Sequence, residues 1–207
     1  RERPAPVLQE EVKDRRGRCD VALSFGEIHD RVRRGLPLLH LDVGHAIAGL
    51  QTTMHEAMAI FAPNINVYRR FRPNEYTPVT RDWGDNNRST AIRLPMSGSG
   101  QSRRLEHRVS GANAKPYLVT AAVAPAGIHH GLTHRLTPSE KAGGNAGVRI
   151  DPTLPLTIWS ALQALRQAEI LPGYLDARYL EIYHDVKAAE FNSFMDLISG
   201  REFRWYL

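Results

Sequence analysis

One short segment of the 207-residue chain alternates strictly between two kinds of side chain. Its first set is Leu105, His107 and Val109, and its second set is Arg104, Glu106 and Arg108. This period of two predicts a β-strand, because successive side chains of a strand point to opposite faces. Burying unpartnered charges is costly, so the charged face must meet solvent, a partner or a ligand. The fold must therefore contain a sheet with one core face and one polar face.

Helical spacing governs much of the remaining chain. Apolar residues from Ile47 to Phe61 recur every three or four positions, and Pro63 stops them, which predicts a helix ending before Asn64. Pro116 is suited to open a further helix that Pro125 should kink. Two more helices are predicted near residues 158–171 and 177–198.

Two further strands are predicted at Val79–Trp83 and Thr90–Leu94, with a turn over residues 84–87 between them. Helices and strands together indicate an α/β (α+β) fold. We expect an incomplete antiparallel curved sheet or barrel, backed by helices. Residues 1–44 show no clean period, and we expect irregular structure there.

Bulk composition limits the functional classes. Apolar residues make up 42% of the chain, and none of their runs is long enough to span a bilayer. Cys19 is the lone cysteine, so no internal disulfide can form, and no secretory signal precedes it. A cytoplasmic location without a membrane partner is expected. The chain opens without Met, which suggests a fragment or a processed form.

The formal net charge is +5, and much of the basic charge is arginine on predicted loops and strands. Five arginines surround one glutamate in sequence: Arg70, Arg88, Arg93, Arg104, Arg108 and, between the last two, Glu106. Guanidinium groups suit phosphate and carboxylate, and a glutamate suits Mg²⁺ or Mn²⁺. This set favours a phosphoryl-transfer site. Taken alone, the segment from Arg104 to Val109 could also be an edge strand whose charged face meets solvent. Glu106 argues against a nucleic-acid site, since it would repel a phosphate backbone.

Four motifs in series resemble the glutamine synthetase family, in order and in spacing. The stretch Asn64-x-Asn66-x-Tyr68-Arg69-Arg70 resembles its Tyr-Lys/Arg-Arg segment. The stretch from Trp83 to Pro95 resembles its Asn-Arg-Ser segment, and Arg103-Arg104-Leu105-Glu106-x-Arg108 resembles its Arg-Arg-Ile-Glu-x-Arg strand. Finally, Asn113-x-x-Pro116-Tyr117-Leu118 resembles its Ala-Asn-Pro-Tyr-Leu helix start. The resemblance covers residues 45–207, which it identifies as the C-terminal portion of a glutamine-synthetase-type catalytic domain.

The resemblance implies a role for each charged residue. Arg70 and Arg108 match arginines that bind glutamate, and Arg88 matches the arginine that acts in phosphoryl transfer. Arg93 and Arg104 match arginines on the ATP phosphates, while Glu106 matches a ligand of Mg²⁺ or Mn²⁺. The implied enzyme is an ATP-dependent carbon–nitrogen ligase that joins the γ-carboxylate of glutamate to an amine through γ-glutamyl phosphate. The family also implies a homo-oligomeric ring.

Two departures from the family pattern affect this expectation. The position of the family's flap glutamate is Tyr76 here, next to Glu75, which resembles the branch that makes γ-glutamyl amides of polyamines or other organic amines. Residues 1–44 do not match the family's N-terminal domain or its Glu-x-Glu metal strand. Little turnover is therefore expected from this chain alone. Ammonia as the acceptor, a non-catalytic family member and a basic nucleic-acid module stay as alternatives.

Overall fold

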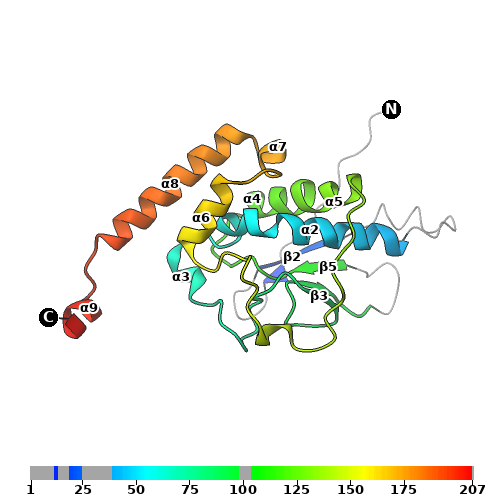
Figure 1. The fold of residues 1–207 in the computed structure, drawn as a ribbon, viewed down its shortest axis with the longest axis horizontal. Helices are drawn as coiled ribbons and strands as arrows, with labels where there is room; N and C mark the ends of the chain where they lie inside the picture. Colours follow the sequence, from blue (N-terminus) through cyan, green and yellow to red (C-terminus); the bar gives the residue numbers. More distant parts are fainter. Residues whose placement is uncertain (1–11, 14–18, 25–38, 98–103, 207) are drawn as a thin grey trace.

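A computed structural model describes residues 12–13, 19–24, 39–97 and 104–206. The described strands form one five-stranded sheet in the order β1-β2-β5-β4-β3. Their bounds are β1 Val12–Lys13, β2 Cys19–Ser24, β3 Trp83–Asp85, β4 Ile92–Leu94 and β5 Arg104–His107. Helices cover one face of this sheet, and long loops lie toward its other side (Figure 1).

The sheet is mixed. β2 pairs antiparallel with β5, and β5 with β4, but β3 runs parallel to β4. The expectation of antiparallel neighbours is therefore wrong for β3 and β4, and β3 begins only at Trp83. No tight hairpin joins these two strands: residues 86–91 form a wide loop that returns the chain to the start of the next strand. Such a short crossover is possible because each strand has only three residues.

Strand β5 has the two faces that its alternation predicts. Leu105 and His107 are 2% exposed, and Val109, just beyond the strand, is fully buried. Arg104 and Arg108 stay partly exposed on the other face. This confirms the sequence-based assignment of the strand and of its core face.

Residues 1–44 were expected to be irregular, and their described part corrects that expectation. β2 pairs over four positions with β5, from Val21 opposite His107 to Ser24 opposite Arg104. Helix α2 already begins at Leu39, eight residues before Ile47, where the predicted helical spacing starts. Backbone pairing with a strong neighbouring strand supplies order here that the local sequence pattern does not reveal.

Helix α2, Leu39–Phe61, is the centre of the core. It packs closely against the helical layer that follows β5. A Cβ at Gly49 would lie 2.1 Å from the carbonyl oxygen of Gly127, and one at Gly131 would lie 2.1 Å from the carbonyl oxygen of His45. Only glycine permits the backbones to approach this closely.

The helix predicted from Pro116 is divided into three parts. α4, Pro116–Ala121, leads into a π-helical segment η2, Ala122–His129, and then into α5, His130–Thr133. Pro125 lies inside η2. A proline has no N–H to donate and clashes with the preceding turn, and the wider π turn accommodates both effects. The predicted disturbance at this residue therefore takes the form of a widened helix.

The C-terminal third is helical. Its elements are α6 Ile158–Arg166, α7 Pro172–Leu175, α8 Ala177–Met195 and α9 Gly200–Tyr206, and two short elements elsewhere are α3 Ile65–Tyr68 and η3 Ala146–Val148. The helix predicted over residues 158–171 stops at Arg166, and the amides of residues 169–171 donate to the side chain of Glu56 on α2. Helix α8 extends away from the body and carries α9 at its far end (Figure 1). Among the described residues, no helix has the length and apolarity needed to cross a bilayer.

Candidate functional site

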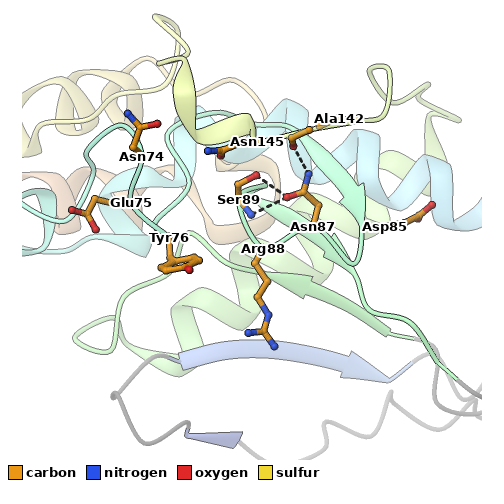
Figure 2. Close-up of a pocket in the computed structure, with 11 residues that line it drawn as sticks. Asn74, Glu75, Tyr76, Asp85, Asn87, Arg88, Ser89, Ala142 and Asn145 are labelled. Atoms are coloured by element: carbon orange, nitrogen blue, oxygen red, sulfur yellow. Dashed lines mark hydrogen bonds between the residues drawn. The ribbon is translucent and has the colours of Figure 1, made fainter.

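An open cleft of about 590 Å³ lies beside the polar loops (Figure 2). Three segments distant in sequence line it: residues 74–76, Asp85 at the end of β3 with residues 87–89 of the loop that follows, and residues 142–145 of a Gly-rich loop that covers residues 140–147. Its volume falls in the range usual for small-molecule sites. Of the six predicted site residues, Arg88 alone belongs to this lining.

The loop that carries Arg88 is built around Asn87. The Asn87 side-chain oxygen accepts hydrogen bonds from the Ser89 amide at 3.0 Å and from the Ser89 hydroxyl at 2.7 Å, and its Nδ2 donates to the Gly144 carbonyl at 2.7 Å. Ser89 Oγ also accepts from the Ala146 amide at 2.9 Å. These bonds join the β3–β4 loop to the Gly-rich loop, and they leave the Arg88 side chain exposed at the cleft.

The segment Asn74-Glu75-Tyr76, which we call the flap segment, forms another wall of the cleft. Asn74 has a φ of 61°, a left-handed conformation that asparagine tolerates better than most residues. Its amide donates to the Gly147 carbonyl at 2.8 Å, and the Tyr76 carbonyl accepts from Arg108 at 3.3 Å. The flap segment is thus held at both ends by tertiary hydrogen bonds.

Arg108 connects the flap segment to the Arg88 loop. Its Nη1 donates to the Arg88 carbonyl and, at 3.1 Å, to the Thr90 carbonyl, while Nη2 reaches the Tyr76 carbonyl. The structure therefore brings together Arg108, expected at glutamate, and the backbone of Arg88, expected at the phosphoryl group.

Glu106 is the centre of a second charged group on the polar face of β5. Its carboxylate is 2.8 Å from Arg93 Nη1 and 3.3 Å from Arg104 Nη2. Arg93 Nη2 also donates to the side chain of Asn86. Glu106 is 8% exposed, so two guanidinium groups offset the cost of burying its charge. The predicted metal ligand and both predicted ATP-phosphate arginines thus meet in one place.

Arg70 occupies a third position, outside the lining of the cleft. Its Nη2 donates to the Val109 carbonyl, and its guanidinium lies 4.4 Å from the centroid of the Phe71 ring. Burial lowers the pKa of Arg70 to about 10, against an opposing effect of Tyr68. Its buried Nε has no hydrogen-bond partner. Arg70 remains charged at neutral pH. Its hydrogen bond to Val109 holds it next to the residue that follows Arg108 in the chain.

His107 was expected only as a core residue of the strand, and the structure confirms that position. Its ring packs against Phe61 with 4.4 Å between centroids. Burial, followed by the nearby charge of Arg70, lowers the pKa of His107 to about 4. The imidazole is therefore neutral at pH 7, and it does not add a cation to the five arginines.

Some lining residues have no counterpart among the predicted site residues. Asn87 and Ser89 shape the loop, and residues 142–145 close the cleft. The turn signal at residues 84–87 and the glycines of the Gly-rich loop were visible in the sequence. Neither signal indicated that these two loops, about 57 positions apart, would pack together.

The fit of a divalent cation depends on the carboxylates present. Within the described ranges, no group of three His, Cys, Asp or Glu side chains is arranged to hold a metal ion. Glu106 offers a single carboxylate, which Arg93 and Arg104 share. These residues suit one ligand position beside bound phosphate but do not amount to a complete metal site.

Comparison with known proteins supplies the family. Residues 41–206 match the family described as "Glutamine synthetase, catalytic domain". The chain belongs to this family. The match begins within the segment 1–44, for which no family likeness was expected, and includes nearly all of α2. Enzymes of the glutamine synthetase family use ATP and divalent metal ions, and act on glutamate with an amine or ammonia.

Several members are similar to this chain. It is 40% identical to gamma-glutamylputrescine synthetase of Escherichia coli over 78% of its own length and 34% of that protein. It is 30% identical to gamma-glutamylethanolamide synthetase of Streptomyces coelicolor over 77% of its length and 34% of that protein. The chain therefore spans about a third of the length of these relatives.

Solved structures of the family have the same fold. GmaS without ligand superposes with a TM-score of 0.69 at 28% identity, covering 80% of this chain and 38% of GmaS. A GmaS complex with ADP gives a TM-score of 0.68 at 27% identity, covering 80% of this chain and 39% of that one. The expected glutamine-synthetase-like α/β architecture is confirmed.

Proposed function

We propose that this chain serves an ATP-dependent ligase that joins the γ-carboxylate of glutamate to an amine. The observation that supports this best is the link made by Arg108, which binds the backbone of both the Arg88 loop and the flap segment. A substrate carboxylate, a phosphoryl group and an incoming amine must meet within a few ångströms for this reaction, and the link holds two walls of the cleft together.

We assign the binding roles from the family resemblance, and the charges and positions of the residues support them. Arg108 and the half-buried Arg70 hold the glutamate carboxylates, while Arg93 and Arg104 hold phosphate oxygens of ATP. Arg88 stabilises charge on the phosphoryl group as it is transferred. A divalent ion, Mg²⁺ or Mn²⁺, would lower the negative charge of the phosphates when bound, and Glu106 is the residue of this chain suited to hold it.

The chemistry proceeds in two displacements. A γ-carboxylate oxygen of glutamate bonds to the γ-phosphorus of ATP, the bond to the bridging oxygen breaks, and ADP leaves with the electron pair. The neutral amine nitrogen then bonds to the carbonyl carbon of γ-glutamyl phosphate. The carbon–oxygen bond breaks, phosphate leaves, and the nitrogen releases one proton to solvent. The residues of this chain position the reactants and stabilise charge in both steps.

We propose an organic amine as the acceptor, in place of ammonia. The relatives named above make amides of putrescine and ethanolamine, and another, 28% identical, is a glutamate–isopropylamine ligase of a Pseudomonas species. Tyr76 stands where the family has a flap glutamate, and it is 67% exposed at the cleft. A tyrosine ring can contact the alkyl chain of an organic amine, whereas the flap glutamate of the family helps to bind ammonium.

We also propose a homo-oligomeric ring and a cytoplasmic location for the enzyme. The ring rests on the family resemblance, and the location rests on the lone cysteine.

The test is mass-spectrometric detection of γ-glutamyl product. The chain is incubated with glutamate, Mg²⁺–ATP and, in separate reactions, ammonia, monoamines and diamines. A γ-glutamyl alkylamide is the expected product, formed in small amounts because the chain spans about a third of the length of its relatives, and absent without ATP and from the Arg88→Ala variant. Glutamine as the sole product would overturn the acceptor assignment. No product with any amine, in a folded chain, would overturn the proposal of activity for this chain.

A further inference from the structure

The flap segment contains a carboxylate that the proposed chemistry does not use. Glu75 is exposed and lines the cleft, and no ion pair involves it within the described part of the chain. The other carboxylate of the lining, Asp85, is already neutralised by Lys141 at 2.6 Å. The two carboxylates of the cleft therefore differ, because Asp85 has a cationic partner and Glu75 has none among the described residues.

The backbone holds Glu75 in a defined place. The Asn74 amide is bonded to Gly147, the Glu75 amide donates to the Arg72 carbonyl at 3.3 Å, and the Tyr76 carbonyl accepts from Arg108. The left-handed Asn74 turns the chain so that the next two side chains reach the cleft. A carboxylate carried by so constrained a turn is presented to a ligand at a low entropic cost.

The order of the side chains along the cleft restricts what Glu75 can do. In Figure 2 the Tyr76 ring lies between the Glu75 carboxylate and the Arg88 guanidinium, and the carboxylate points away from Arg88. Glu75 is therefore displaced from the place where the acyl phosphate reacts. An amine that reacts near Arg88 would pass along the Tyr76 ring, and its far end would approach Glu75.

We propose that Glu75 and Tyr76 form a subsite for the distal ammonium group and methylene chain of a dibasic amine. The inference rests on the proposed ligase function and names its acceptor class: an α,ω-diamine or longer polyamine. Only the reacting nitrogen of such an amine must lose its charge, and the other nitrogen remains an ammonium. Glu75 pairs with that ammonium, while the Tyr76 ring contacts the methylenes and attracts the cation through its face.

Binding tests this inference independently of turnover. Calorimetry or NMR titration measures the affinity of the 207-residue chain for 1,4-diaminobutane and for n-butylamine, at low ionic strength and with γ-glutamyl chemistry excluded by omitting ATP. An exposed ion pair contributes up to ~1 kcal/mol, so the diamine should bind roughly three to five times more tightly than the monoamine. Equal affinities for the two amines would overturn the proposal.

Three variants identify the residues responsible. Glu75→Gln should remove the preference for the diamine, and it should lower the affinity for n-butylamine, which has a single ammonium group, less than the affinity for the diamine. Asp85→Asn is the matched control: it neutralises the other carboxylate of the cleft and should keep the preference. Tyr76→Ala should weaken the binding of both amines, and that of the diamine more, because only the diamine has a distal ammonium group to meet the ring face. A preference that survives in Glu75→Gln, or disappears in Asp85→Asn, would overturn the assignment to Glu75.

The two proposals can fail separately. A diamine preference that depends on Glu75, without amide formation by any amine, supports the subsite and contradicts the ligase activity of this chain. Amide formation at equal rates from n-butylamine and 1,4-diaminobutane, together with equal binding, supports the ligase and contradicts the subsite.

Discussion

Two buried carboxylates of this chain are satisfied in opposite ways. Glu56, on α2 and 3% exposed, accepts hydrogen bonds from the backbone amides of residues 169–171 at 3.0 to 3.4 Å. Glu106, on β5 and 8% exposed, is held by the side chains of Arg93 and Arg104. Backbone amides cannot leave without local unfolding, whereas guanidinium groups can rotate toward another anion.

The difference separates a structural region from a ligand-binding one. The Glu56 region fixes the segment between α6 and α7 onto the central helix, and it offers nothing to a ligand. In the Glu106 region the partners are the guanidinium groups of Arg93 and Arg104, and these can bind a phosphate. Glu56 and Glu106 are both almost fully buried, so burial does not distinguish a site residue from a structural residue here. The two differ in their partners, which are backbone amides for Glu56 and arginine side chains for Glu106.

Removal of Glu56 should give the largest effect. In Glu56→Ala, three backbone donors lose their acceptor, one of them buried and two partly buried, and the free energy of unfolding should fall by roughly 3–5 kcal/mol. Glu106→Ala should lower it by less, roughly 1–3 kcal/mol, because Arg104 is 42% exposed and can turn to water while the 14% exposed Arg93 loses its charged partner. Urea denaturation followed by circular dichroism measures both. Equal losses in the two variants would break the comparison.

Acid should destabilise the chain through His107, which lies on the core face of β5, the strand that also carries Glu106. The folded pKa of His107 is lowered from 6.5 to about 4, so the unfolded chain takes up a proton first as pH falls. Stability is then lost between about pH 6.5 and pH 4, by roughly 3 kcal/mol at ~1.4 kcal/mol per pH unit. The variant His107→Leu is the control. Its unfolding free energy should show less dependence on pH in this window than the parent chain, and an unchanged slope would exclude His107 as the cause.

Replacing a guanidinium in the ligand-binding region should impair binding more than folding. Arg93 uses separate nitrogens for Glu106 and Asn86, and a lysine cannot form both contacts. We expect Arg93→Lys to weaken ATP binding about tenfold, ~1.4 kcal/mol, with a smaller change in the free energy of unfolding. Arg81→Lys is the control: Arg81 pairs with Asp151 at 2.9 Å, outside the cleft lining. A similar loss of ATP affinity in both variants, measured by calorimetry, would contradict the assignment.

The exposed pair of the cleft should give the smallest effect. The Lys141 and Asp85 side chains are 50% and 57% exposed, and such pairs contribute little in water. Lys141→Met should change the free energy of unfolding by less than ~0.5 kcal/mol in urea titrations. A larger loss would mean that this contact holds the Gly-rich loop in place, and that the loop belongs with the structural region.

Local sequence patterns were sufficient for parts of this molecule and insufficient for others. The alternation around Glu106 located β5 and its core face, and the spacing from Ile47 to Phe61 located most of α2. The parallel pairing of β3 with β4 was not visible, since strands of three residues carry too short a pattern to define direction. β2 was not visible either, because its pairing with β5 supplies the order.

Residue types at fixed spacing are local properties, so they were sufficient to indicate the family, the two-faced strand, and the arginines and Glu106 as site residues. Tertiary structure alone decided which of these charges meet. It placed Arg93 on Glu106, joined Arg108 to the Arg88 loop and the flap segment, and put Glu75 on a cleft. Contacts between residues so far apart in the chain depend on how the sheet and helices pack, and no local pattern encodes that packing.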